Sequence, residues 1–151
     1  MKNKNETELA LSRVIDASRE RIWAAFVDGK TIGMWWGPNG FSTTTHERSF
    51  TVGGMWRYTM HGPDGTDYPN RVIYEELVAP ERIAYRHDAD ADNDPQHFRT
   101  TITLEDVHGE TRVTLCMQCA SAVMREHIAK NGAIEGGNQT LARLAAFIAQ
   151  Q

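Results

Sequence analysis

The 151-residue sequence predicts an α+β domain with an antiparallel sheet of six or seven strands, two short helices after the first strand, and one long helix at the C-terminus. Three patterns indicate this fold. Apolar residues alternate along a short opening segment and again, at length, through residues 41–119, whereas they follow helical spacing in residues 18–36 and 121–150. Because short turns join the predicted strands, we expect an antiparallel meander.

The opening strand is expected around residues 9–15, where leucine and isoleucine share one face. Ser18 is a suitable N-cap for a first helix, which the Asp-Gly pair at 28–29 ends. A second short helix is expected to run up to Trp35 and Trp36. Since adjacent helical positions point about 100° apart, we predict that one indole is fully buried and that the other borders a cavity.

The long alternating region is divided by turns that contain glycine, among them GG, HGPDG and HG. One of its strands carries Trp56, Tyr58 and Met60 on a single face. The spacing then becomes helical again, with an apolar stripe made of Ile134, Leu141, Leu144, Ala145 and Ile148.

Two successive glycines, Gly136 and Gly137, interrupt the stripe of the C-terminal helix. A glycine inside a helix costs about 1 kcal/mol relative to alanine, so the pair calls for a reason. Close packing of a neighbour, a kink and an open cavity between helix and sheet would each account for it. We favour the cavity.

Composition excludes several classes of function. The net charge of −4, without a block of like charges, lacks the basic surface that nucleic-acid binding requires. The N-terminal segment lacks the apolar core of a signal peptide, and no apolar run reaches the length of a membrane span. We therefore expect a single cytoplasmic domain over residues 1–151, with neither a nucleic-acid nor a membrane partner.

Cys116 and Cys119 form the sequence CMQC, whose spacing occurs in redox pairs and zinc sites. The surrounding residues read as a strand, in which positions three apart face opposite sides. A redox pair normally begins at a helix N-terminus, and zinc would need two further ligands. We interpret both cysteines as structural.

The candidates for acid–base chemistry are Glu76, His87, His61, His97 and His127. Glu76 shares a strand face with Tyr74, and an inward-facing carboxylate would have a raised pKa; we favour the alternative that a neighbour satisfies it by hydrogen bonding. His87 shares a face with Tyr85, and both ligand contact and simple packing stay open. No histidine pair has metal-site spacing, and we predict no catalytic residue, metal or cofactor.

The chain resembles the single-domain bacterial homologues of the heat-shock-protein-90 ATPase activator, within the START-like or SRPBCC superfamily. The resemblance is carried by RVIDASRERIWAAFVD, WWGPNGFSTT, VGGMWRYTMHGPDGTDYP, YEELVAPERIAY and EGGNQTLARLAAFI. It implies a helix-grip fold, also called Bet v 1-like, in which a curved sheet and a long C-terminal helix enclose a hydrophobic pocket. Such relatives commonly carry an aromatic residue at Gly137 and tryptophan at His87, which implies a roomier or more polar pocket here.

START-like relatives bind lipids, sterols, polyketides and plant hormones, and some are cyclases, so the fold alone does not assign a function. We expect a binding protein for a small hydrophobic molecule rather than an enzyme. A chaperone-interaction module and a cyclase-type enzyme using a pocket carboxylate or histidine are the alternatives. The residues expected to contact the ligand are Trp36, Phe41, Trp56, Tyr58, Met60, Tyr74, Glu76, Tyr85, His87, Phe98, Met117, Gly137 and Leu141.

Overall fold

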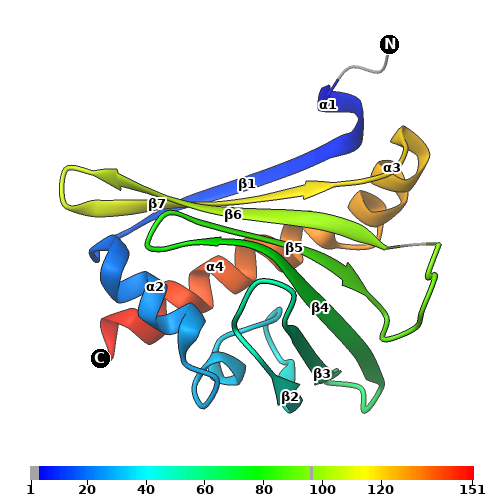
Figure 1. Cartoon of the computed structure of the whole chain (residues 1–151), viewed down its shortest axis with the longest axis horizontal. Helices are drawn as coiled ribbons and strands as arrows, with labels where there is room; N and C mark the ends of the chain where they lie inside the picture. Colours follow the sequence, from blue (N-terminus) through cyan, green and yellow to red (C-terminus); the bar gives the residue numbers. More distant parts are fainter. Residues whose placement is uncertain (1–3, 96) are drawn as a thin grey trace.

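The computed structural model describes residues 4–95 and 97–151 and contains one antiparallel sheet that curves around the last helix (Figure 1). Within these residues the sheet has seven strands in the order β1-β7-β6-β5-β4-β3-β2. They are β1 (Glu8–Ile15), β2 (Ser42–Arg48), β3 (Met55–His61), β4 (Asp67–Val78), β5 (Arg82–Asp88), β6 (Phe98–Val107) and β7 (Glu110–Gln118). The helix-grip fold expected from the sequence is confirmed.

Two helical elements follow β1, as predicted, and a short helix precedes it. The helices are α1 (Lys4–Thr7), α2 (Arg19–Val27), the 3-10 turn η1 (Ile32–Met34), α3 (Ala122–Lys130) and α4 (Ala133–Ala149). The Ser18 side chain accepts a hydrogen bond from the backbone N–H of Arg21 and caps α2. At the β6–β7 turn, His108 and Gly109 both have positive φ, which suits a tight hairpin connection.

The C-terminal segment forms two helices instead of the single long helix predicted. The helix is interrupted at Asn131 and Gly132, where Gly132 adopts a left-handed conformation with φ 89°. Helix α4 buries Leu141, Leu144 and Ile148, whereas α3 has no buried residue. Helix α3 therefore rests on the end of the sheet without entering the core. On α4, Ile134, which was expected in the apolar stripe, is 41% exposed.

The core lies between the concave face of the sheet and helices α2 and α4. Trp35 is 1% exposed and meets the Phe26 ring edge-on, with ring centres 5.0 Å apart. Trp36 is partly buried and borders a cavity. The prediction that the two indoles divide in this way is confirmed, although the preceding turn is a 3-10 turn and not an α-helix.

Candidate functional site

A cavity of about 430 Å³, here called the main cavity, lies between the sheet and the two C-terminal helices. Strands β3 to β7 contribute the side chains Tyr58, Met60, Asn70, Tyr85, His87, Phe98, Thr100, Leu115 and Met117. The opposite wall consists of His127 and Ile128 on α3, the turn at 131–133, and Gly136, Gly137 and Thr140 on α4. The loop at 36–38 completes it. Such a concave, mostly apolar space with a few polar groups is typical of small-molecule sites.

Helix α4 fixes the loop that follows the two tryptophans. The guanidinium of Arg143 donates to the backbone carbonyls of Met34, Gly37 and Pro38, at 3.1, 2.8 and 3.0 Å. The indole Nε1 of Trp36 donates to the Tyr58 hydroxyl oxygen at 3.1 Å. These bonds hold Trp36 in place as a wall of the main cavity.

His87 is the polar group whose geometry is most fully determined. Its Nε2 lies 2.6 Å from Oδ1 of Asn70, and the Asn70 amide Nδ2 donates to the Tyr68 carbonyl oxygen at 2.9 Å. The second bond fixes the orientation of the amide, so Oδ1 faces His87 as an acceptor. Nε2 of His87 therefore carries the proton. Phe98 packs against the imidazole with ring centres 4.8 Å apart.

Burial controls the protonation states of this wall. It lowers the pKa of His87 to about 4, against the opposing negative charges of Asp88 and Asp94. It also raises the pKa of Tyr58 and of Tyr85 well above the ordinary range of tyrosine. At neutral pH the imidazole and both phenols are consequently uncharged.

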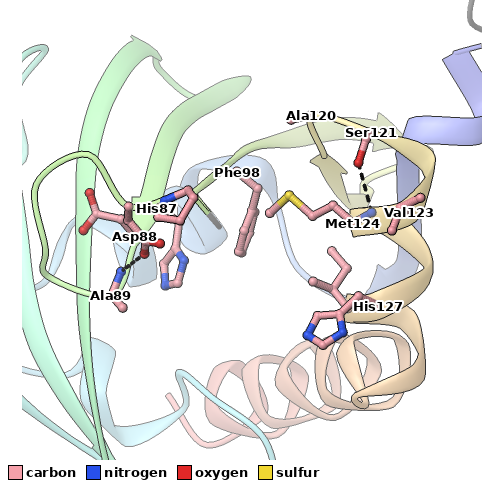
Figure 2. Close-up of a pocket in the computed structure, with 12 residues that line it drawn as sticks. His87, Asp88, Ala89, Phe98, Ala120, Ser121, Val123, Met124 and His127 are labelled. Carbon is pink, nitrogen blue, oxygen red and sulfur yellow. Dashed lines mark hydrogen bonds between the residues drawn. The ribbon is translucent and has the colours of Figure 1, made fainter.

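A second cavity of about 480 Å³, the adjoining cavity, shares His87, Phe98, His127 and Ile128 with the main cavity. Figure 2 shows the imidazole of His87, the ring of Phe98 and the side chain of Met124 projecting into the space between the sheet and α3. The shared residues make the two spaces neighbours along one groove beneath α3.

The main cavity brings together eight of the residues predicted to contact a ligand: Trp36, Tyr58, Met60, Tyr85, His87, Phe98, Met117 and Gly137. Five others lie elsewhere, and Glu76 is the fifth. Phe41 packs against Tyr68, with ring centres 6.0 Å apart, and Leu141 is buried on the core-facing side of α4. Arg48 donates a hydrogen bond to the Tyr74 hydroxyl oxygen and lies over the Trp56 ring, 5.1 Å from its centre, so both aromatics belong to the core around Arg48.

The placement of Glu76 corrects the expectation that it faces the pocket. Strand β4 has a register shift between Tyr74 and Glu76, so Glu76 pairs with Ala84 and points to the outer face. There it forms an ion pair with Arg82, with Oε1 and Nε 3.0 Å apart. A carboxylate satisfied by a neighbour was the favoured interpretation, but the bulge puts it outside the cavity altogether.

Gly137 borders the main cavity, yet the space directly above its Cα is occupied. A Cβ added there would collide with the Cδ1 methyl of Leu11 on β1. The sequence interpretation of a simple void is therefore wrong in part. Gly137 permits close approach of Leu11, while the cavity opens beside it.

Sequence reasoning missed Asn70, Thr100 and Thr140 among the lining residues. Alternation could have found two of them, because Asn70 lies on the face of Val72 and Thr100 on that of Phe98. Thr140 lies one turn after Gly136 on α4 and donates to the Gly136 carbonyl. No local pattern in the sequence indicated that His127 and Ile128 of α3 line the cavity, because their placement depends on the interruption between α3 and α4 at Gly132.

Among residues 4–95 and 97–151, no group of three or more His, Cys, Asp or Glu side chains is placed to hold a metal ion. No helix in those ranges has the length and apolar character that crossing a membrane demands. Cys116 lies within β7, with Sγ 3.6 Å from Oε2 of Glu8, and burial raises the pKa of Cys119.

Several solved bacterial structures share the fold. A protein from Arthrobacter aurescens is 26% identical with a TM-score of 0.89, covering 100% of this chain and 91% of that chain. One from Chromobacterium violaceum is 27% identical with a TM-score of 0.79, covering 94% and 96%. A structure described as the AHSA1 protein from Silicibacter pomeroyi is 22% identical with a TM-score of 0.75, covering 95% and 98%, and shows likeness of fold.

No curated protein matches the sequence. The family model described as "Activator of Hsp90 ATPase homolog 1-like protein" matches residues 16–149, which span the chain from the end of β1 to the last residue of α4. The chain therefore belongs to the family of activator of Hsp90 ATPase homolog 1-like proteins.

Proposed function

We propose that this protein binds a small hydrophobic molecule in the main cavity. The observation that carries the proposal is the space of about 430 Å³ between the sheet and α4, walled by Trp36, Tyr58, Phe98 and Met117. Ligand pockets are concave spaces of about 300–1,000 Å³, and this space has such a volume. Apolar walls with few polar groups suit a molecule that is itself largely apolar.

A cavity-filling variant tests the proposal. Thr140 faces the main cavity from α4, so Thr140→Trp should fill part of it. Ala146 is exposed on the same helix, and Ala146→Trp is the matched control. The uncharged dye N-phenyl-1-naphthylamine should give saturable fluorescence with wild type and Ala146→Trp but not with Thr140→Trp. Equal binding by all three proteins, or by none, would contradict the proposal.

Native mass spectrometry of the protein purified from its own host addresses the natural ligand. We expect a small-molecule adduct on wild type that is reduced on Thr140→Trp and retained on Ala146→Trp. An adduct of equal abundance on both variants would place the molecule outside the main cavity.

A chaperone-interaction module is the second candidate, and the family description favours it. Its test is the ATPase rate of purified Hsp90 with increasing amounts of this protein. A saturable increase would support it, and an unchanged rate at saturating protein would reject it. The cyclase-type alternative would have to use a histidine, His87 or His127, because no Asp or Glu among the described residues lines the main cavity.

A further inference from the structure

The polar groups of the main cavity restrict the ligand more than its volume does. His87 and Tyr58 both line the cavity, on β5 and β3, with Asn70 on the strand between them. His87 and Tyr58 each use one hydrogen-bonding atom or lone pair within the protein. The donor or acceptor that each has left is available to a ligand.

For His87 that position is an acceptor. Since Nε2 donates to Asn70 Oδ1, Nδ1 of the neutral ring carries a lone pair. The described residues give Nδ1 no hydrogen-bond partner. His87 lines both the main cavity and the adjoining cavity, and Figure 2 shows its ring projecting into the adjoining one. A lone pair in such a setting favours a partner that donates a hydrogen bond.

For Tyr58 the remaining position is a donor. Its oxygen already accepts from Nε1 of Trp36, and no acceptor among the described residues receives its own hydroxyl proton. The cavity thus offers one acceptor and one donor, which matches a hydroxyl group or a hydroxyl together with a neighbouring oxygen.

The charges around the main cavity further restrict the class of ligand. No Lys or Arg side chain among the described residues lines the main cavity, so an anionic ligand would have no counter-charge there. Asp88 and Asp94 line the adjoining cavity, where Asp88 is already paired with Arg71, so neither side chain offers an anion a positive partner.

We propose that the ligand of the main cavity is a neutral, largely apolar alcohol or phenol whose hydroxyl donates to Nδ1 of His87, with Tyr58 as the complementary donor. This rests on the proposed function and specifies its ligand class. Fatty acids and other carboxylates are expected to bind more weakly, because no Lys or Arg side chain among the described residues lines the main cavity. The positioning residue is Asn70, which fixes the tautomer of His87.

The test compares 2-naphthol, its methyl ether 2-methoxynaphthalene and the anion 2-naphthoate by calorimetric titration at neutral pH. One neutral hydrogen bond is worth about 0.5–1.5 kcal/mol, so 2-naphthol should bind about two- to twelvefold more tightly than the ether, with naphthoate weakest. In His87→Phe the preference should fall to about one because the acceptor is lost. His127→Phe changes the other histidine of this cavity and should keep the preference.

Equal affinity of wild type for naphthol and the ether, or a preference that persists in His87→Phe, would overturn the inference and leave hydrophobic binding intact. Absence of binding by all three probes would instead remove the proposed function itself. If His87→Phe does not fold, ¹⁵N NMR of wild type decides. The imidazole should show a protonated Nε2 and an Nδ1 resonance that moves with naphthol but not with the ether; a protonated Nδ1 would refute the assignment.

Discussion

Replacing His87 by phenylalanine should remove a specific part of the pH dependence of stability. His87 is held uncharged by burial, which lowers its pKa from 6.5 to about 4, while Asp88 and Asp94 act in the opposite direction. Asn70 and Phe98 contact the ring, and His127 lies across the same cavity. Phenylalanine keeps a flat ring of similar size but cannot take up a proton.

The direction of the change in unfolding free energy follows from the pKa of His87 in the folded and unfolded protein. Below pH 6.5 the unfolded chain protonates this histidine, whereas the folded protein does not until about pH 4, so acid favours the unfolded state over that window. The full difference corresponds to about 3 kcal/mol, since one pH unit of pKa difference is worth about 1.4 kcal/mol. About 2.5 kcal/mol of it should be lost between about pH 7.5 and about pH 4.5.

Urea denaturation of both proteins across this range measures the effect. The difference in unfolding free energy, wild type minus His87→Phe, should fall by about 2.5 kcal/mol on acidification, because other titrating groups largely cancel. The hydrogen bond lost to Asn70 adds an offset that does not change with pH. Parallel curves for the two proteins would show that His87 is not held uncharged, as would a titration midpoint near 6.5 for its NMR signals.

Three further changes probe the packing. Gly137→Ala should stabilise a Leu11→Ala protein by about 1 kcal/mol but leave the stability of wild type about unchanged, because the new Cβ meets the Leu11 methyl only in wild type. Equal effects of Gly137→Ala on the two proteins in urea melts would contradict this contact. Arg71→Ala should lower the unfolding free energy by about 3–5 kcal/mol, since Asp88 is 4% exposed and loses its bidentate partner; a loss under about 1 kcal/mol would show that water replaces the pair. Ser121→Ala removes the N-cap of α3 and should cost about 1 kcal/mol, detected as faster amide exchange confined to that helix; exchange rates that match wild type would assign the cap no role.

Most of the secondary-structure elements and much of the aromatic wall could be predicted from the sequence. Alternation and helical spacing are properties of neighbouring residues, so they located the strands, α2 and α4 without reference to the rest of the fold. The division between Trp35 and Trp36 was also predicted, although the chain there leaves a 3-10 turn and is not α-helical. Six of the eight expected residues that line the main cavity lie on strands, where side chains on one face share its environment.

The tertiary structure decided what depends on register and on distant parts of the chain. One extra residue in β4 turned Glu76 outward, and period-two reasoning fails at such a bulge because every later side chain changes face. Leu11 fills the space above Gly137 only because β1 passes beneath α4. The tautomer of His87 depends likewise on Asn70, a residue of the neighbouring strand whose amide orientation is set by a backbone carbonyl. Contacts of this kind follow from strand pairing and helix docking, which no local pattern encodes.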